Sequence, residues 1–486
     1  MAALNLIDRA DLPAGWETLD LGCLRQSQSR TFNPLSAGTE LYELYSVPSH
    51  EYGKPEITAA SDIGSNKQFV STKDVLISKI NPRINRTWVV GERGKLPQIA
   101  STEWIVFPSN EAVHSRLLGH FLRDIRIRDY LTHNASGVGG SLTRVRPDIF
   151  DGVEIPLPPL PEQHRIVAKI EELFSELDAG TASLTRARAQ LKTYRQALLK
   201  AAFEGKLTAP WRAANPDKLE SPETLLSRIR KERDTRFAAA LDDWQTALSE
   251  WRAGGEAGRK PGKPSRPDPL SELATGNAEL DGWPIFELRD LISVSSGQGL
   301  TSSEMNGGRH PVYGGNGITG FHDQWFLKEP NLIIGRVGAK CGVTHITQEF
   351  AWVTDNALIV TPLVDSFDQR FFLYRLEYMN LNALGSSTGQ PVISGSKIYG
   401  QEIALPTLNE QSAVADIIEA LDSGCAKLSD EITSALTRIT ALRQSILKKA
   451  FSGQLVAQDP ADEPASALLA RLAQAPAPKP RRKTKP

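Results

Sequence analysis

The chain has 486 residues, 40% of them hydrophobic, and a formal net charge of −1. This length predicts several domains with real cores, and the balanced charge argues against a uniformly basic surface, so binding to nucleic acid would require local segregation of charge. The three cysteines lie far apart, which favours a reducing compartment and argues against a cysteine-based zinc site. Because no signal-peptide core and no run of eighteen apolar residues is found, we expect a soluble cytoplasmic protein.

Residues 1–156 are predicted to form one α+β domain. Strand-like runs occur at residues 74–80, 87–90 and 104–107, between turns rich in Gly and Asn. An amphipathic helix is predicted over residues 115–132. The combination indicates a strand-rich body with a helix near its end.

Residues 157–209 contain a long predicted helix. Pro161 and Glu162 suit its first turn, and Gly205 suits a left-handed residue at its end. Apolar residues recur every seven positions, which is the spacing of a coiled-coil seam. These seam residues are Ile170, Leu177, Leu184, Leu191 and Leu198, with a second row three residues later that includes Leu173, Ala187 and Tyr194.

Residues 210–281 are unlike the rest of the chain. A helix over residues 225–252 is predicted to begin after Ser221, and residues 254–269 form a Gly-, Pro- and Lys-rich linker. A second α+β domain follows at residues 282–404. Its strand-like runs are residues 331–336, 342–346 and 356–360, and a helix is predicted over residues 366–383.

The long helix returns in residues 405–457. Glu162-Gln163 corresponds to Glu410-Gln411 and Ala202-Phe203 to Ala450-Phe451, both at an offset of 248 residues. The second seam contains Ile418, Cys425, Ile432, Ile439 and Ile446, with Leu421, Leu428 and Leu442 in its second row. Two equally long, narrow seams can bury each other, so we predict an antiparallel coiled coil within an internal pseudo-twofold repeat. The alternative is that each helix packs on its neighbouring domain.

Residues 458–486 are predicted to be a short helix with a basic tail.

The motifs of several enzyme classes are missing. Asn81-Pro82-Arg83-Ile84 lacks the second proline and the aromatic residue of an amino-methyltransferase, and Pro156 stands where a metal-dependent nuclease would need a lysine. The run from Gly335 to Lys340 has the wrong spacing for a phosphate loop, and the eight histidines form no ligand pair. We therefore expect no catalytic residue and no metal site.

The repeated phrases identify a family. Leu157-Pro-Pro-Leu-Pro-Glu162-Gln163 and Leu405-Pro-Thr-Leu-Asn-Glu410-Gln411 each precede a long helix, which ends at Ala202-Phe203 or Ala450-Phe451. With the segment that begins at Asp459, these phrases resemble the specificity subunit of a Type I restriction-modification system over nearly the whole chain. The insertion at residues 210–281 is longer than the minimal pattern of that family.

The resemblance implies two target recognition domains, each of which reads one half of a split, asymmetric DNA sequence. The long helices would set the spacer between the halves and hold two modification (methyltransferase) subunits, which restriction (translocase and nuclease) subunits join. No cofactor is expected in this subunit, and S-adenosylmethionine, ATP and Mg²⁺ are expected in the partner subunits. The resemblance also implies that the subunit carries neither active site. The lack of a long apolar run predicts that it contacts no membrane.

Polar side chains in turns are the candidate DNA contacts, because Arg, Lys, Asn and Gln distinguish base edges while Lys, Ser and Thr bind phosphates. In the first domain they are Lys54, Lys67, Lys79, Arg83, Asn85, Arg86, Ser141, Thr143 and Arg144. In the second domain they are Gln298, Ser302, Asn306, Arg309, Asn316, Arg336, Lys340, Thr388 and Gln390. Two other hypotheses remain: a coiled-coil adaptor whose globular domains bind proteins, and a fused enzyme, which the missing motifs disfavour.

Overall fold

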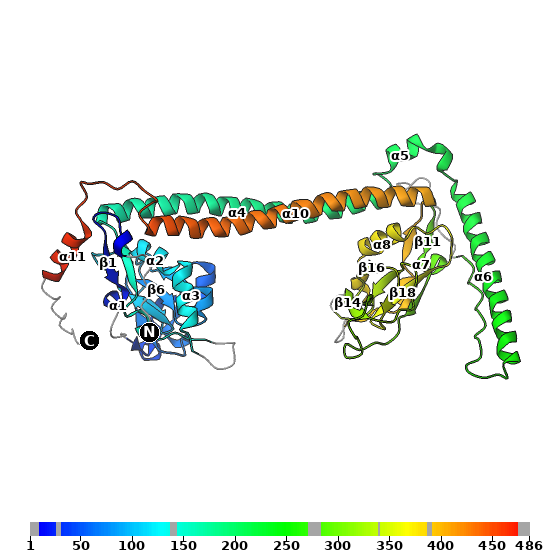
Figure 1. The fold of residues 1–486 in the computed structure, drawn as a ribbon, viewed down its shortest axis with the longest axis horizontal. Coiled ribbons are helices and arrows are strands. Elements are labelled where there is room, and N and C mark those ends of the chain that lie inside the picture. The colour runs from blue at the N-terminus through cyan, green and yellow to red at the C-terminus, as the bar shows by residue number, and fades with distance from the viewer. Residues whose placement is uncertain are drawn as a thin grey trace. The chain divides into compact units, whose positions relative to one another are not determined.

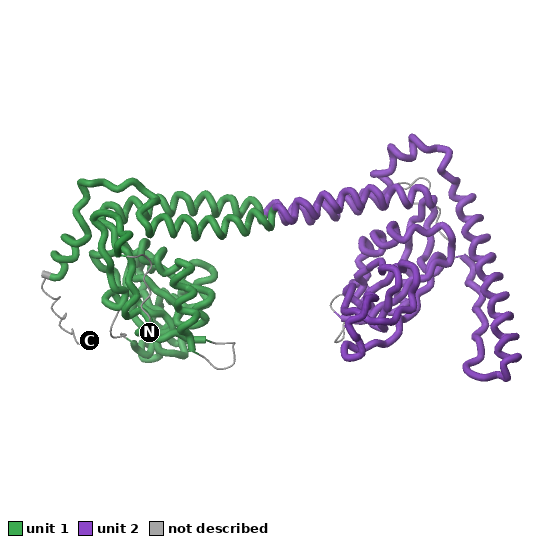
Figure 2. The backbone as a smooth tube through the Cα atoms, viewed as in Figure 1, with its two compact units in different colours: residues 1–185, 432–486 green, residues 186–431 purple. Residues whose placement is uncertain are grey.

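The computed structural model describes residues 9–25, 31–136, 143–270, 283–338, 341–385 and 391–474. The chain divides into two compact units: residues 1–185 with 432–486 form the first unit, and residues 186–431 form the second (Figure 2). Each unit holds one globular domain together with part of each long helix (Figure 1). None of the described helices combines the length and the apolar composition that crossing a lipid bilayer requires.

The domain of the first unit has one three-stranded and one five-stranded sheet, ordered β7-β6-β9 and β2-β5-β8-β3-β4, and a β1-β10 pair. β6 and β9 are buried along their whole lengths, which explains why the sequence shows them as continuous apolar runs. The elements in chain order are η1 (Arg9–Asp11), β1 (Glu17–Asp20), α1 (Leu21–Leu24), β2 (Thr31–Phe32), η2 (Pro34–Ala37), β3 (Leu41–Tyr45), η3 (Pro48–Tyr52), β4 (Glu56–Ala59), η4 (Ala60–Asp62), β5 (Lys67–Phe69), β6 (Val75–Ser78), η5 (Pro82–Ile84), β7 (Thr87–Val89), β8 (Gln98–Ser101), β9 (Trp104–Phe107), α2 (Ser115–Leu122), α3 (Ile125–His133), η6 (Pro147–Phe150) and β10 (Glu154–Leu157).

The domain of the second unit has sheets ordered β12-β18-β15-β16 and β14-β13-β17, and a β11-β19 pair. Its elements are β11 (Ile285–Glu287), α7 (Leu288–Leu291), β12 (Ile292–Ser296), β13 (His310–Gly314), β14 (Gly317–His322), β15 (Leu332–Gly335), β16 (Thr344–Ile346), β17 (Trp352–Val353), β18 (Ala357–Pro362), α8 (Gln369–Tyr378), η8 (Leu381–Leu384), α9 (Gly395–Tyr399) and β19 (Glu402–Ala404).

The predicted strands are all present, but two predicted helices are not continuous. The helix expected over residues 115–132 is broken into α2 and α3, because the Asp124 side chain accepts a hydrogen bond from the Arg126 amide and caps a new helix. Similarly, α8 ends at Tyr378, and Asn380 adopts a left-handed conformation before η8. The strand predicted from residue 356 begins at Ala357, since Asn356 lies in the preceding turn.

The long helices are α4 (Leu160–Phe203) and α10 (Leu408–Phe451), and they pack antiparallel in both units. In the first unit, Arg443 pairs with Asp178 and its guanidinium lies 4.9 Å from the Phe174 ring. In the second unit, Arg195 pairs with Asp422 at 2.8 Å. Arg195 and Arg443 are 248 residues apart, so the internal repeat extends to the contacts between the helices.

All ten seam residues are buried or half-buried, whereas part of the predicted second row is exposed. Tyr194, Leu428 and Leu442 are about half exposed, at 53%, 51% and 50%. The inward positions lie one residue later, at Arg195 and Arg443, because 3.6 residues per turn do not keep a strict seven-residue repeat. The prediction of these three residues as second-row contacts is therefore wrong.

Glu162 and Glu410 anchor the starts of the two long helices to the domains. The indole N–H of Trp16 donates to Glu162 at 2.9 Å, and that of Trp283 donates to Glu410 at 3.0 Å. Burial raises the pKa of Glu162, an effect that the hydrogen bond from Trp16 opposes. Glu410 also receives Arg212 at 2.6 Å, from the chain that follows α4.

Gln163 and Gln411 fix the chain that enters α2 and α8. The Gln163 oxygen accepts from the His114 amide at 2.7 Å, and its nitrogen donates to the Ala112 and Pro158 carbonyls. Gln411 makes the same set of bonds, to Asp368, Ser366 and Pro406. Both side chains are fully buried, so the repeated Glu-Gln pair is the joint between helix and domain.

The ends of the long helices pack on the domains through phenylalanine. Phe451 stacks on Phe121 with ring centroids 3.9 Å apart, and Phe203 meets Phe371 edge-on at 5.7 Å. Gly205 and Gly453 then leave the helices with φ near +70°, a conformation that favours glycine. Each domain thus rests on the start of one long helix and the end of the other.

The insertion forms α5 (Ala209–Ala214), η7 (Pro216–Lys218) and α6 (Pro222–Ala253), and α11 (Ala465–Gln474) follows α10. Leu225 and Ile229 of α6 are buried in the core of the second unit. In the first unit, the Ala465 amide donates to the Gly15 carbonyl at 2.9 Å and Asp462 pairs with Arg165 at 2.7 Å. The last helix therefore packs beside the entrance to the first domain.

Candidate nucleic-acid interface

The two domains share a strand order that their sequences do not reveal. In both, a buried central strand (β6 or β15) pairs with a following short strand (β7 or β16) and with a second buried strand (β9 or β18). In both, a hairpin (β3-β4 or β13-β14) pairs in parallel with the strand that precedes that second buried strand. The turns of one domain can therefore be matched to the turns of the other.

The residue that directly follows the central strand makes the same backbone hydrogen bonds in each domain. The Lys79 amide donates to the Glu103 carbonyl at 2.8 Å, and the Lys79 carbonyl accepts from Val145 at 2.9 Å. The Arg336 amide donates to the Asn356 carbonyl at 2.9 Å, and its carbonyl accepts from Ile393 at 2.9 Å. Lys79 and Arg336 are structural equivalents, and three segments meet at each of them.

In the first domain this junction carries a turn in which two asparagines are left-handed. Asn81 and Asn85 have φ of 48° and 49°, and between them Arg83 and Ile84 are exposed. The Asn81 amide donates to the Thr143 carbonyl at 2.8 Å. Left-handed conformations are uncommon outside glycine, so this turn is held in a specific shape that presents Arg83 to solvent.

Two basic side chains flank that turn. Lys79 donates to the Thr102 carbonyl at 2.6 Å, and burial lowers its pKa. Arg144 is 57% exposed and pairs with Glu103 at 2.9 Å. Because Arg144 retains accessible N–H groups, it can exchange that ion pair for a phosphate or base edge.

The other candidates of the first domain have different roles. Lys67 is buried and donates to Ser65, so it supports β5, and its position does not support the prediction that it contacts DNA. Asn85 accepts from the Thr87 hydroxyl, and Arg86 is 3.5 Å from Glu51. Lys54 is exposed between η3 and β4. Among the described residues, no hydrogen bond connects it to the turn at residues 81–85. Ser141 lies outside the described residues.

In the second domain the matching turns surround a cavity of about 680 Å³. The cavity is lined by residues 299–302, 305, 314–316, 319, 337 and 354–356. This set contains the predicted contacts Ser302 and Asn316, both exposed. Gly315 allows the hairpin to approach the junction, since a Cβ there would lie 3.0 Å from the Asn356 carbonyl. The cavity thus collects polar groups from four separate stretches of chain.

The remaining candidates surround this cavity or support it. Arg336 is half-buried and donates to Ser296 at 3.2 Å, while Gln298 and Arg309 are exposed. The exposed Asn306 accepts hydrogen bonds from the Gly308 and Asp323 amides through its side-chain oxygen, which closes a turn. Lys340, Thr388 and Gln390 lie outside the described residues.

Three residues at these turns escaped the sequence-based prediction. They are Glu103, Asp355 and Asn356, which lie at the junctions, and Asp355 and Asn356 are exposed. The short polar stretch Thr354-Asp355-Asn356 between two apolar runs was the available signal for a turn. Carboxylate and amide groups accept or donate at base edges, so both residues belong to the candidate interface. Among the described residues, no three His, Cys, Asp or Glu side chains gather as a metal site requires.

Comparison with known proteins agrees with this architecture. Residues 33–186 and 281–438 match a family model described as the Type I restriction modification DNA specificity domain. The EcoKI specificity subunit of Escherichia coli strain K12 is 26% identical over 383 residues, which cover 76% of this chain and 73% of that protein. The StySPI specificity subunit of Salmonella potsdam is 26% identical over 377 residues, or 73% of this chain and 70% of that protein. A solved chain from a type I restriction-modification system has the same fold, with a TM-score of 0.65, 21% identity and coverage of 91% of this chain and 99% of that chain.

Proposed function

The chain belongs to the Type I restriction-modification DNA specificity family, and we propose that it is the subunit that selects the DNA sequence in such a system. The observation that carries this proposal is the pair of matched junctions at Lys79 and Arg336. One backbone arrangement is used twice and carries different side chains each time. This is what two readers of unlike half-sites require.

In this proposal residues 1–156 and 282–404 are the two target recognition domains. Arg83, Arg144 and Thr143 read or position the first half-site, and Gln298, Ser302, Asn316 and Arg336 the second. Asp355 and Asn356 are added to the second set, because they line the same cavity. The paired helices at residues 157–209 and 405–457 separate the readers and set the spacer.

In this proposal the methyl-transfer and cleavage reactions take place in partner subunits. Two modification subunits and the restriction subunits would bind this chain, and they would supply S-adenosylmethionine, ATP and Mg²⁺ binding. The absence from the sequence of methyltransferase and phosphate-loop motifs supports a non-catalytic role for this subunit. Family membership and the paired junctions favour this role over that of a protein-binding coiled-coil adaptor.

The test is a domain exchange. Residues 283–400 are replaced by the corresponding segment of a relative with a different specificity, and the complex with its modification subunits is assayed by mapping methylated sites. One half of the recognised sequence is expected to change while the other half and the spacer stay the same. A change in both halves, or no sequence-dependent methylation by the parent complex, would refute the proposal.

A further inference from the structure

The insertion between the long helix and the second domain builds an arm, residues 222–270, which consists of α6 and the linker that returns along it. Trp244 donates its indole N–H to the Pro261 carbonyl at 3.1 Å, and Trp251 donates to the Gly258 carbonyl at 3.4 Å. The Lys263 ammonium lies 5.7 Å from the Trp244 ring. These contacts hold the linker against α6, and its prolines restrict its conformations further.

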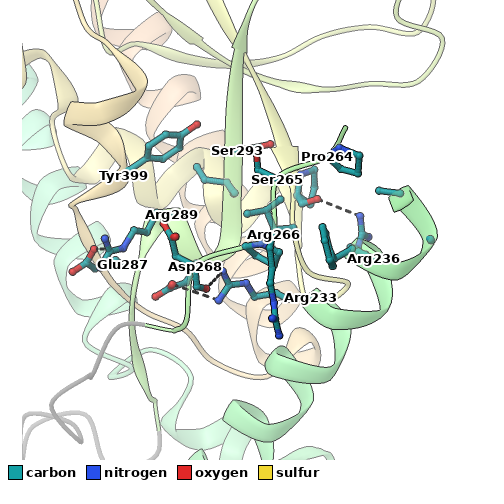
Figure 3. A pocket seen from close by; sticks show the side chains of 18 of the residues that line it. Arg233, Arg236, Pro264, Ser265, Arg266, Asp268, Glu287, Arg289, Ser293 and Tyr399 are labelled. Atoms are coloured by element: carbon teal, nitrogen blue, oxygen red, sulfur yellow. Dashed lines mark hydrogen bonds and ion pairs between the residues drawn. The ribbon is translucent and has the colours of Figure 1, made fainter. Parts of the chain in front are cut away.

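The arm is docked on the second domain. Glu232 accepts from the Asp365 amide at 2.9 Å and from the Ser366 hydroxyl at 3.1 Å. Arg233 is buried, where it donates to the Asp268 carbonyl at 2.8 Å and lies 3.6 Å from Asp290. Figure 3 shows Arg233, Arg236 and Arg266 of the arm around a cavity of about 970 Å³ that Glu287, Arg289 and Tyr399 of the domain also line. The buried contacts make the arm part of the second reader.

The returning linker is a locally basic stretch of the second unit. Residues 257–267 contain Arg259, Lys260, Lys263 and Arg266 and no acidic residue. All four side chains belong to exposed residues, and none forms an ion pair among the described contacts. By contrast, residues 283–400 carry eight Lys and Arg against ten Asp and Glu, a net charge of −2. Positive charge is therefore concentrated on the linker of the arm and not on the reading domain.

The surface chemistry of the arm fits a polyanion better than a protein. Protein interfaces are rich in aromatic residues and poor in lysine at their centres. Among residues 222–270 no large apolar side chain is strongly exposed, since Phe237, Trp244 and Trp251 are half-buried against the arm and linker. Unpaired Lys and Arg on a Gly- and Pro-rich strand match the repeating charges of a phosphate backbone.

The arm lies along one edge of its domain. Within the second unit, α6 runs alongside the domain at the edge opposite β14, and the far end of α6 and β14 lie on the same side of α10 (Figure 1). Duplex DNA that contacts the β13-β14 turn and extends across this domain would continue toward the linker.

We propose that the arm binds the phosphates of duplex DNA outside the half-site read by the second domain, through Arg259, Lys260, Lys263 and Arg266. This inference rests on the proposed function, because it takes DNA as the ligand of the reading turns. Its contribution is independent of base sequence. It compensates for the negative charge of the second domain, which otherwise repels the backbone.

The experiment compares the complete complex with a quadruple variant in which the four cations become alanine. Binding is measured on duplexes that extend either about five or about twenty-five base pairs beyond the second half-site. On the long duplex the variant is expected to bind roughly tenfold more weakly at 0.1 M salt, and the slope of log affinity against log salt should fall by as much as about 3.6, since each phosphate contact contributes about 0.9. On the short duplex the two proteins should be equal, and the recognised sequence should not change.

A matched variant, Arg259→Lys with Arg266→Lys, retains the charge and should bind as the parent does. Equal salt slopes for parent and quadruple variant on the long duplex would overturn the inference. Loss of a modification subunit from the quadruple variant would also overturn it and indicate a protein contact. If the parent showed no sequence preference while the quadruple variant still lost its salt slope, the arm contact would stand and the proposed function would fail.

Discussion

The two globular domains have the same backbone plan and carry different surfaces on it. At the first junction Arg83 protrudes from a turn bracketed by two left-handed asparagines, with Arg144 beside it. At the second, Asn316 and Asp355 border a cavity and Arg336 is half-buried. The joints to the long helices, in contrast, are alike in sequence and in contacts. The comparison indicates that the joints fix each domain on the long helices, while the turns differ in the side chains that they expose.

The largest predicted effect tests whether the joints are equivalent. Phe203→Ala and Phe451→Ala should each lower the free energy of unfolding by about 3–5 kcal/mol, because each removes a buried aromatic ring at the end of a long helix. Chemical denaturation of the full chain measures this loss. Tyr194→Ala is the control, with an expected change below about 0.5 kcal/mol, as Tyr194 is half exposed. A large loss for only one of the two phenylalanines would break the equivalence.

The next effect should distinguish the two joints. Glu410 is buried and pairs with Arg212 at 2.6 Å, so Glu410→Gln should cost about 2 kcal/mol. Glu162 is equally buried but relies on Trp16, and an amide oxygen can still accept that bond, so Glu162→Gln should cost less than about 0.5 kcal/mol at neutral pH. Thermal unfolding of both variants decides the order. Equal losses would show that Arg212 contributes little to the second joint.

The pH dependence of the Glu162 variant sharpens the same point. Burial raises the pKa of Glu162 in the folded protein above its ordinary value, so the folded state binds the proton more tightly than the unfolded state. Stability from this group is therefore greatest below the ordinary pKa and is lost as the pH rises through the raised pKa. Relative to the parent, Glu162→Gln should gain stability as the pH rises across that window. A flat difference between pH 4 and pH 8 would contradict the assignment.

The last effect concerns the turns and is expected in DNA discrimination. Arg83→Ala should weaken discrimination at the first half-site by about 1–2 kcal/mol, and Asp355→Ala should do so at the second. Competition binding with site variants altered in one half at a time measures both. Arg9→Ala, which removes an exposed arginine paired with Glu154 away from the turns, is the control. An effect of either variant on the opposite half-site would remove its assigned role.

The long helices could be recognised from the sequence because their signal is local and repeated. Seven-residue spacing, two Glu-Gln starts and two Ala-Phe ends lie at one constant offset, so the antiparallel pair and the internal repeat were predictable. The central strands were also predictable, since a strand covered on both faces, such as β6 or β15, is a continuous apolar run. Short strands such as β8 and β17 lack that signal.

Only the folded chain identified Lys79 and Arg336 as equivalents. Their neighbours differ in sequence, and the bonds that define them join backbone groups of residues 79, 103 and 145 or 336, 356 and 393. Backbone hydrogen bonds are made by every residue type except proline as donor, so they leave no trace in the side-chain pattern. For the same reason Lys67 could be assigned to the interior of its sheet, and Asp355 to the interface, only after distant segments had been brought together.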